Sequence, residues 1–395
     1  MKCSKCRRDA ILFQRYSGLH LCEQHFNRDF EAKAKRAIRE HRWIESGDTV
    51  AVALSGGKDS SAVLFFLHRL LGERRDVRLM AITVDEGIGG YRDPARAGAI
   101  AESMGVPWVT ASFAGEYGVT LDEIVGRKGT GLSCSYCGVL RRALMNRIAR
   151  EHGVTKFAYG FNLDDEAQSV LMNALRGDAE RLTRPMRETE GMVPRIKPFM
   201  YIPEREVALY AFLHVEGFDL AGCPYAGDAL RGDVRGILDD YTYRHPATKY
   251  SLVNLGEALR RTEKPGAEKM GFGVCERCGE RLPERQELEH REVRDATAGT
   301  AGARAPEGAK PCGERLPERQ ELEHREVRDA TAGTAGARAP KNDVPSGCDG
   351  SSESELEKPG RVSGTEFEHR RCEGAKPCGR ICRTCQILDE MRRGT

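Results

Sequence analysis

The sequence predicts an α/β fold, with a parallel β-sheet that carries helices on both faces and a small zinc knuckle near each terminus. Three observations lead to this prediction. Between residues 31 and 271, short apolar stretches typical of buried strands alternate with longer stretches typical of helices. A loop rich in glycine and serine follows the first of these strands. Pairs of cysteine or cysteine and histidine, two residues apart, stand near both ends.

The predicted elements follow one another in a regular order. A basic stretch over residues 28–45 predicts a helix, and the apolar run from Val50 to Leu54 predicts a buried strand over 49–54. The later elements are a helix over 60–71, a strand over 78–84, a helix over 93–104, a strand over 108–112, a helix over 139–152, a strand over 156–160 and a helix over 164–175. Because parallel sheets bind ligands beyond the carboxyl ends of their strands, we expect the loops after Leu54, Val84 and Gly160 to meet at one site.

Composition excludes a membrane protein. The 395 residues, enough for about two to three domains, include 62 Lys and Arg against 60 Asp and Glu, which leaves a net charge of +2. Apolar runs such as 50–54 and 62–67 are too short to cross a bilayer. Residues 1–9 are charged and contain two cysteines, unlike a secretory or transit signal. We expect a cytosolic protein, whose paired cysteines more often hold metal than form disulfides.

An exact repeat divides the C-terminal third of the chain. Residues 279–306 recur letter for letter as 313–340, and the first copy has only three large aliphatic residues, Leu282, Leu288 and Val293. Neither copy can bury enough apolar surface to offset the entropy of ordering, so we interpret 279–378 as a disordered insertion. A tandem duplication without function and a charged helical spacer around 284–294 are the alternatives. The predicted domains are an N-terminal zinc finger (1–30), an α/β domain (31–271), and a C-terminal zinc knuckle (272–278 plus 379–395).

The loop after the first strand has the chemistry of a phosphate site. It reads Ser55-Gly56-Gly57-Lys58-Asp59-Ser60-Ser61, so small residues, a helix N-terminus, a lysine and two hydroxyls converge. The spacing differs from that of a Walker A loop. It is similar to the SGGxDS pattern of the PP-loop pyrophosphatases, which have an adenine nucleotide alpha hydrolase-like fold and cut ATP between the α and β phosphates. That resemblance implies a pyrophosphate-binding loop with Asp59 near Mg²⁺; the alternative is a plain helix-capping turn.

Two further segments belong to the same predicted site. Thr83 and Asp85 end the second strand, where an adenine would contact the backbone. Residues 160–167 close a later strand and bring Asp164 and Asp165 to the start of a helix. Carboxylates there can hold a metal ion or orient the ribose, and simple N-capping is the alternative.

The first cysteines form a complete ligand set. Cys3 and Cys6 are followed, after a loop of fifteen residues, by Cys22 and His25. This spacing predicts a closed structural zinc site, with free thiols as the alternative.

The last cysteines form a similar but interrupted set. Cys275 and Cys278 are separated from Cys382 and Cys385 by 103 residues that contain the insertion. We interpret them as a second zinc knuckle, in which Cys378 is a competing ligand.

The middle cysteines differ in kind. Cys134 and Cys137 precede the helix that carries Arg141, and Cys223 stands alone farther on. Three thiolates do not complete a zinc site but can hold a [4Fe-4S] cluster with one iron open. A redox pair or a persulfide-carrying thiol is the alternative, and spacing does not decide between them.

These motifs occur together in one family. The chain resembles the TtuA/NcsA family of tRNA 2-thiouridine synthetases in five features that occur in order. They are residues 55–60, Cys134-Ser-Tyr-Cys137-Gly-Val-Leu-Arg-Arg, Gly160-Phe-Asn-Leu-Asp-Asp-Glu-Ala, Cys223-Pro-Tyr, and the cysteine knuckles at both ends. The resemblance covers residues 1–278 and 379–395. It implies that ATP adenylates the C2 carbonyl oxygen of a tRNA uridine and that sulfur then replaces this oxygen. The implied cofactors are ATP, Mg²⁺, a [4Fe-4S] cluster and two Zn²⁺ ions.

The resemblance also assigns residues. Cys134, Cys137 and Cys223 would ligate the cluster, whose open iron can carry a hydrosulfide, and Arg141 stands where some members have lysine. An arginine there is better suited to stabilise phosphate charge than to transfer a proton. The ATP site would comprise Ala53, Leu54, Ser55, Gly56, Gly57, Lys58, Asp59, Ser60, Ser61, Thr83, Gly160 and Asp165; the catalytic residues would be Asp59, Arg141, Asp165, Cys134 and Cys223.

The implied partners are tRNA, a thiocarboxylated ubiquitin-like protein or sulfide as sulfur donor, and a second copy of the chain. Residues 1–50 contain eleven Lys and Arg against seven Asp and Glu, and 176–205 add further arginines, which suits contact with phosphates but also a solvated surface. Cytidine 2-thiolation, an amidotransferase-type synthetase and a noncatalytic zinc RNA-binding scaffold are the alternatives. Whether the wobble or the T-loop uridine is modified is left open.

Overall fold

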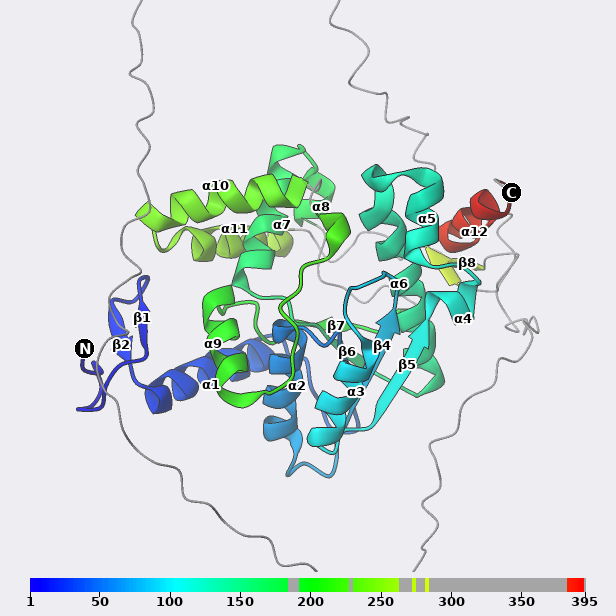
Figure 1. Ribbon diagram of the computed structural model, residues 1–395. Helices are drawn as coiled ribbons and strands as arrows, with labels where there is room; N and C mark the ends of the chain where they lie inside the picture. The colour runs from blue at the N-terminus through cyan, green and yellow to red at the C-terminus, as the bar shows by residue number, and fades with distance from the viewer. Residues whose placement is uncertain (184–191, 227–229, 263–271, 275–280, 284–381, 394–395) are drawn as a thin grey trace, which may run out of the picture. The chain divides into compact units, whose positions relative to one another are not determined.

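A computed structural model describes residues 1–183, 192–226, 230–262, 272–274, 281–283 and 382–393 (Figure 1). All of them belong to one compact unit, which comprises Met1–Gln286 and Gly364–Thr395. Among these residues, no helix is both long and apolar enough to cross a membrane. The insertion predicted over 279–378 lies outside the described residues, except that Arg281–Pro283 form a short strand rather than disordered chain.

The predicted parallel sheet is confirmed. Its strands stand in the order β5 (Trp108–Ser112), β4 (Arg78–Asp85), β3 (Thr49–Ala53), β6 (Lys156–Ala158) and β7 (Arg195–Ile196), and every neighbouring pair is parallel. The chain order reverses between β3 and β6, which are neighbours in the sheet. Their carboxyl ends therefore border the crevice where open α/β sheets bind ligands.

Strand β3 has the sequence expected of a strand buried on both faces. Val50 and Val52 belong to the hydrophobic cluster on one face of the sheet, while Ala51 belongs to the cluster on the other face. This alternation follows from the two-residue repeat of a strand, and it explains why the whole strand reads as apolar.

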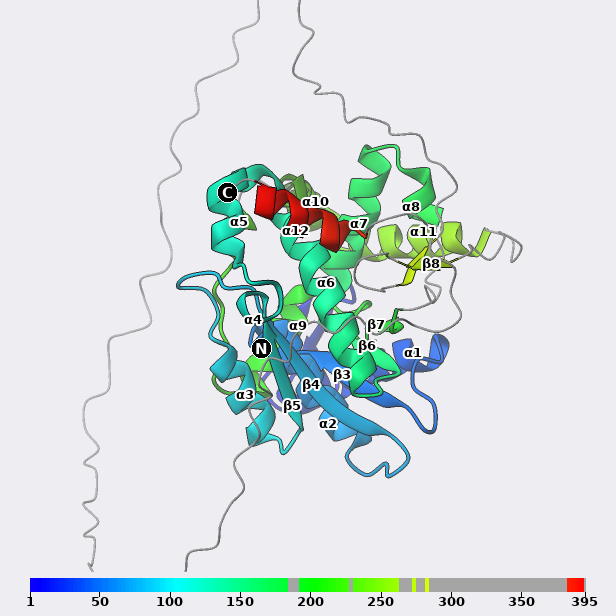
Figure 2. The same ribbon diagram turned by 90° about the vertical axis from the view of Figure 1, so that its right-hand side faces the viewer.

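Helices cover both faces, as expected (Figure 2). One cluster receives side chains from α1 (Glu23–Glu40), α2 (Lys58–Leu71), α3 (Pro94–Ser103), α7 (Leu163–Leu175) and α9 (Glu204–His214). The other receives them from α5 (Leu121–Lys128), α6 (Ser133–Glu151) and α12 (Arg383–Arg393). The remaining elements are β1 (Leu12–Gln14), β2 (Leu19–Leu21), α4 (Phe113–Tyr117), η1 (Thr130–Leu132), α8 (Ala179–Thr183), η2 (Pro224–Ala226), α10 (Leu230–Arg244), α11 (Thr248–Thr262), β8 (Phe272–Val274) and β9 (Arg281–Pro283).

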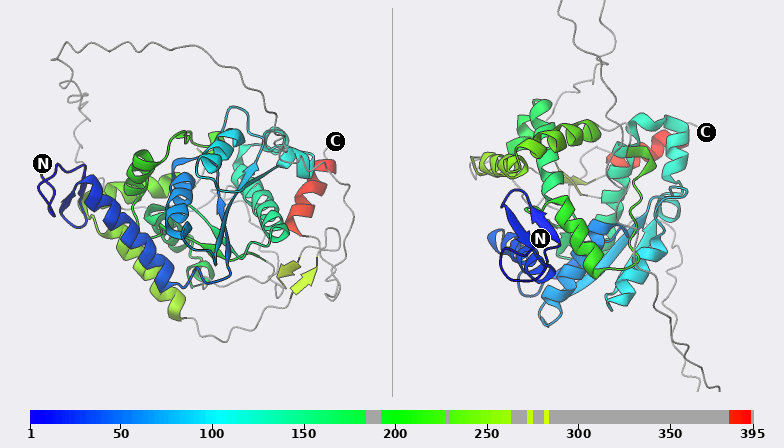
Figure 3. Two further views of the ribbon diagram at one scale, coloured as in Figure 1. Left: turned by 90° about the horizontal axis from the view of Figure 1, so that it is seen from below. Right: turned by 60° about the vertical axis from the view of Figure 1, so that its left-hand side comes forward.

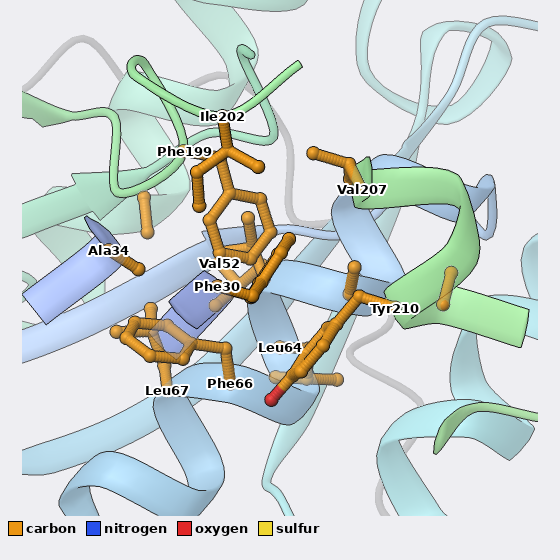
Figure 4. Close-up of a cluster of buried hydrophobic side chains, with 14 of the residues drawn as sticks. Phe30, Ala34, Val52, Leu64, Phe66, Leu67, Phe199, Ile202, Val207 and Tyr210 are labelled. Atoms are coloured by element: carbon orange, nitrogen blue, oxygen red, sulfur yellow. The ribbon is translucent and has the colours of Figure 1, made fainter. Parts of the chain in front are cut away.

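Aromatic packing joins α1 to α9 (Figure 4). The Phe30 ring stacks on the Tyr210 ring with centroids 4.0 Å apart, and its edge meets Phe199 at 4.9 Å. Phe26, Phe30, Ala34 and Ala37 recur on one face of α1 at helical spacing and are fully buried. The basic helix therefore has an apolar stripe that fixes it against the core.

The N-terminal hairpin, β1 with β2, is fastened to α9 by a buried carboxylate. Glu206 Oε1 accepts hydrogen bonds from Tyr16 Oη at 2.6 Å and from Gln14 Nε2 at 3.2 Å, and Lys33 Nζ lies 3.2 Å from Glu206 Oε2. Glu206 is 3% exposed, so its charge is kept in the interior by these three partners. The hairpin lies at the N-terminal end of α1 (Figure 3), and just beyond the other end of this helix His41 Nε2 lies 3.6 Å from Glu257 Oε1 on α11.

Two helices differ from their predicted bounds by about five residues, whereas the other elements differ by at most two. The helix expected over 28–45 begins at Glu23 and ends at Glu40, just before Arg42, whose φ of +50° is incompatible with a right-handed helix. The helix expected over 139–152 begins at Ser133, so Cys134 and Cys137 lie inside its first turns rather than ahead of it. The apolar periodicity becomes regular only beyond residue 139, which is why the sequence placed this start too late.

Candidate functional site

The phosphate loop is held in shape by its own serine. Ser60 Oγ lies 3.1 Å from Ser55 N, which donates to it, and itself donates to Gly57 O at 3.1 Å. Gly56 has a φ of +73°, which favours glycine, and Gly57 begins α2 without any side-chain cap. The first turn of α2 is thus available to bind an anion. Ser61 is fully buried and its Oγ atom has no hydrogen-bond partner among the described residues, so its role as a phosphate donor stays a prediction.

Gly160 allows the loop after β6 to lie directly against the phosphate loop. A Cβ atom at this position would stand 2.8 Å from the carbonyl carbon of Asp59 and 2.9 Å from Ser60 N. The end of β4 contacts the start of the phosphate loop as well, because Thr83 Oγ1 donates to Leu54 O at 2.7 Å. The three loops expected to share one site therefore meet.

The two aspartates at the start of α7 have different roles. Asn162 is the N-cap, and Asp165 forms a reciprocal capping box with it, accepting from Asn162 N at 3.2 Å while its own N–H donates to Asn162 Oδ1 at 3.1 Å. Asp164 does not cap α7; it accepts from Glu204 N at 2.8 Å and pairs with Lys249. Simple capping therefore fails as an explanation for Asp164 and accounts for only part of the role of Asp165.

Carboxylates and cations alternate beside the loop. Lys58 Nζ lies 2.8 Å from Asp59 Oδ2 and 2.9 Å from Glu204 Oε1, and Arg231 Nη1 lies 3.2 Å from Asp165 Oδ1. The pKa of Asp165 is raised to about 6, mainly by burial and also by the nearby charges of Asp59 and Glu204, against the effects of the Asn162 backbone and Arg231. Burial also raises the pKa of Asp59, against the charge of Lys58. Such crowded oxygen donors fit a hard divalent cation such as Mg²⁺.

Arg92 is a residue of this site that the sequence did not single out. Its Nη2 atom lies 2.9 Å from the point that a Cβ of Gly57 would occupy, so the guanidinium rests on the phosphate loop. Its Nε atom is buried without a hydrogen-bond partner in the described part of the chain. The backbone of Arg92 has a φ of +30°, a left-handed conformation that is strained for arginine. The only signal in the sequence was an arginine ahead of the Asp-Pro start of α3.

The three middle cysteines lie near enough to one another to interact electrostatically. Cys134 and Cys137 lie one turn apart on α6, and Cys134 Sγ is 3.7 Å from Tyr225 O, two residues beyond Cys223. Burial raises the pKa of Cys137 to about 11, Arg141 opposes this shift, and the charges of Cys223 and Cys134 add to it. Among the described residues, the only metal-ligand group whose atoms all lie within 4.8 Å of one another is elsewhere. The thiols are therefore too far apart for one ion, and their set fits a larger cluster.

Tyr91 and Arg92 connect the phosphate loop to the cysteines. Burial raises the pKa of Tyr91. Among the nearby charged groups, Arg92 and Arg141 lower this pKa, whereas Cys223 and Glu86 raise it. Arg141 Nη1 in turn lies 3.0 Å from Glu86 Oε1, immediately after β4. The phosphate loop and the three cysteines are thus connected through the segment that follows β4.

The N-terminal ligand set converges as predicted. The ligand atoms of Cys3, Cys6, Cys22 and His25 all lie within 4.8 Å of one another. His25 Nδ1 is 3.4 Å from Cys3 Sγ and 3.3 Å from Cys22 Sγ, and the Cys6 and Cys22 sulfurs are 3.7 Å apart. Four soft donors in this arrangement fit a structural Zn²⁺ ion.

The C-terminal ligand set is described only in part. Cys382 and Cys385 are buried at the start of α12, where Cys385 N donates to Cys382 Sγ at 3.4 Å. Cys275 and Cys278 belong to the segment between β8 and β9, outside the described residues. The second zinc knuckle therefore stays a prediction.

Two of the predicted nucleic-acid contacts form ion pairs with carboxylates of this chain. Lys197 Nζ lies 2.6 Å from Glu166 Oε1, and Arg181 Nε lies 3.2 Å from Asp178 Oδ2. Arg184 and Arg187 lie outside the described residues. The stretch 176–205 is therefore a weaker candidate for RNA contact than its charge indicated.

Comparison with protein families assigns most of the described chain. Residues 2–27 match the model described as the N-terminal LIM domain of the 2-thiouridine synthetase TtuA. Residues 26–219 match the PP-loop domain.

Individual relatives cover nearly the same region. The chain is 36% identical over 302 residues to the tRNA 2-thiolation protein NcsA of Haloferax volcanii, a match that spans 71% of this chain and 94% of the relative. It is 38% identical over 284 residues to the cytoplasmic tRNA 2-thiolation protein 1 of Drosophila grimshawi, spanning 70% and 82% of the two chains.

A solved structure is also similar. The U34-tRNA thiolase NcsA from Methanococcus maripaludis, solved with its [4Fe-4S] cluster, superposes with a TM-score of 0.62 at 34% identity. The match covers 71% of this chain and 91% of that one.

The close approach at Gly160 leads to a first prediction. Gly160→Ala should displace the phosphate loop, because its Cβ would overlap backbone atoms of Asp59 and Ser60 that cannot move independently. We expect ATP to bind at least about tenfold more weakly, which is about 1.4 kcal/mol, as measured by calorimetry. The control is Gly126→Ala on α5, where nothing lies within 4 Å. Equal ATP affinity in the two variants would contradict this account.

The N-terminal ligand set leads to a second prediction. His25→Ala should lower the zinc content by one ion per chain, as counted by elemental analysis, because it removes one of four ligands. The control is His20→Ala on strand β2 of the N-terminal hairpin. It should leave the zinc content unchanged, since His20 stacks on Phe13 and is not in the ligand set. Loss of zinc from both variants or from neither would show that the site is misassigned.

Proposed function

Because the chain belongs to the TtuA/NcsA family of tRNA 2-thiouridine synthetases and is an ATP-dependent tRNA sulfurtransferase, we propose that it adenylates the C2 carbonyl oxygen of a tRNA uridine and then replaces that oxygen with sulfur. One observation carries the proposal. The phosphate loop and the three cysteines are neighbours through Tyr91 and Arg92. Adenylation of the base and the later insertion of sulfur can therefore take place without moving the base to a distant site.

In the first step, the uridine O2 atom attacks the α-phosphorus of ATP. The bond between the α-phosphorus and the bridging oxygen breaks, pyrophosphate leaves, and the N3 proton of uridine is released. Lys58, Arg92 and the N–H groups at the start of α2 would hold the pyrophosphate. Asp59 and Asp165 would provide oxygen ligands for Mg²⁺. Preorganised positive charge of this kind stabilises the charge that develops on the departing phosphates.

In the second step, hydrosulfide attacks C2 of the adenylated uridine. The bond between C2 and O2 breaks, AMP leaves with that oxygen, and the hydrosulfide proton goes to N3, so 2-thiouridine forms without a change in oxidation state. Burial lowers the pKa of the Arg141 guanidinium, but the neighbouring Cys137 and Glu86 outweigh this effect and raise the pKa above its usual value. Arg141 therefore stays cationic and would stabilise the negative charge of the incoming sulfur and the leaving AMP.

Cys134, Cys137 and Cys223 are the residues that would hold a [4Fe-4S] cluster. Three protein thiolates leave one iron without a protein ligand, and this supplies a position for exogenous sulfur. The relative from M. maripaludis contains such a cluster. Because that relative is a U34-tRNA thiolase, uridine 34 is the target that we propose.

The rest of the proposal follows the family resemblance. The sulfur would come from a thiocarboxylated ubiquitin-like protein or from sulfide, and the working unit would be a homodimer in the cytosol. The animal relatives are named cytoplasmic tRNA 2-thiolation proteins, which supports that location.

The position of Arg92 generates a test of the adenylation step. Arg92→Ala should slow tRNA-dependent release of pyrophosphate from ATP by about 100-fold, the usual effect of removing one preorganised charge donor. Asp59→Asn should slow it comparably, whereas Arg96→Ala, exposed on the following helix, should not. Wild-type pyrophosphate release by the Arg92 variant would refute its role. Pyrophosphate release that does not depend on tRNA would refute adenylation of the RNA.

The three-thiol set generates a test of the cofactor. Protein purified without air should be brown, and Cys134→Ala, Cys137→Ala and Cys223→Ala should each lose the visible absorption, because a ligand is removed. Ser135→Ala, exposed between the first two ligands, should keep it. Colour retained in all three cysteine variants would contradict the cluster assignment.

A further inference from the structure

A second cavity lies beside the nucleotide site but shares none of its phosphate-loop or cysteine residues. It has a volume of about 250 Å³ and is enclosed by the N-terminal hairpin, the starts of α7 and α9, and the facing ends of α10 and α11. Asp164 lines it, whereas its neighbour Asp165 belongs to the nucleotide site. The cavity is thus lined by a neighbour of the proposed nucleotide site and not by the residues of that site.

The walls of the cavity are aromatic. Phe13, Tyr16, Tyr243 and Tyr250 line it, and the rings of Tyr16 and Tyr250 are 5.0 Å apart. The guanidinium carbon of Arg15 lies 4.3 Å from the centre of the Tyr243 ring. Tyr243 is 69% exposed and Phe13 is 42% exposed, so large apolar rings face solvent at the rim. Aromatic and arginine planes of this kind are the surfaces on which proteins stack unpaired RNA bases.

The cavity also offers polar groups to the edge of a ring. Thr242 Oγ1 is buried and has no hydrogen-bond partner among the described residues, although Thr242 lines the cavity. Lys249 Nζ, on the same wall, is 2.6 Å from Asp239 Oδ1. A volume near the lower end of the range for small-ligand sites, about 300–1,000 Å³, suits one planar ring system better than an extended ligand.

The charge around the cavity favours a polyanion. Its acidic residues are neutralised: Asp164 and Asp239 both pair with Lys249, and Glu206 pairs with Lys33. Two basic residues that line the cavity, Arg15 and Arg205, form no ion pair with any described residue. The unpaired charge of the cavity lining is therefore positive, as expected for contact with RNA phosphates.

We infer that this cavity binds one unpaired nucleotide of the tRNA, distinct from the uridine that is modified. The base stacks on Tyr243 and Phe13, its edge meets Thr242, and its phosphates meet the unpaired arginines. The inference rests on the proposed function only in taking tRNA as the partner. Holding a second nucleotide fixes the register of the RNA, so that the target uridine reaches the adjacent site.

The matched pair Tyr243→Ala and Tyr241→Ala tests this inference. Both tyrosines are exposed on α10, at 69% and 47%, but only Tyr243 lines the cavity. Loss of one stacked base should weaken tRNA binding by roughly 5- to 100-fold at fixed salt, measured by fluorescence anisotropy on the full chain. Phe13→Ala should weaken it similarly, Tyr241→Ala should not, and ATP affinity should stay unchanged in all three.

The outcomes separate this inference from the proposed function. Equal tRNA affinities of the Tyr243, Phe13 and wild-type proteins would overturn the inference, as would an equal loss in the Tyr241 variant. Ultraviolet crosslinking should join the peptide that contains Tyr243 to a nucleotide other than the thiolated one, and a crosslink to the thiolated uridine would overturn the inference instead. Failure of the wild-type protein to bind any tRNA would reject the proposed function itself.

Discussion

The contact between two loops at the centre of the sheet is the constraint on which the rest of the site depends. The loop after β6 lies on the phosphate loop, and only the absence of a side chain at Gly160 permits this approach. Because β3 and β6 are neighbours at the point where strand order reverses, their loops emerge side by side. That contact places Asp59 next to the start of α7, and each loop contributes a paired carboxylate, Asp59 with Lys58 and Asp165 with Arg231.

A second consequence concerns the three middle cysteines. The segment after β4 turns back at the strained residue Arg92, whose guanidinium lies against Gly57. The charge of Cys223 contributes to the raised pKa of the neighbouring Tyr91, so this residue lies near the cysteines. The same segment contributes Glu86, the partner of Arg141 on α6. The segment after β4 therefore contacts the phosphate loop on one side and the cysteine-bearing helix α6 on the other. This explains why the phosphate loop and the three thiols are neighbours.

Local pattern predicted the scaffold well. The strand over 108–112 and the phosphate loop were foreseen because buried strands and glycine-serine loops are determined by nearby sequence. The placement of Arg92 was not, since it depends on a backbone reversal and on a contact with a residue 35 positions earlier. Asp164 was mistaken for a possible cap because its partners, Glu204 and Lys249, come from distant helices. Pairing between residues of distant helices produces no periodic pattern in the sequence, so local spacing does not predict it.

The central claim is that this chain places sulfur on C2 of a tRNA uridine by means of its phosphate loop. The most direct test is mass spectrometry of ribonuclease fragments of tRNA from cells that lack the gene, complemented either with the wild-type chain or with Asp59→Asn. The account predicts that 2-thiouridine at position 34 is lost, returns with the wild-type chain and does not return with the variant. Unchanged 2-thiouridine at every tRNA position in cells without the gene would contradict it.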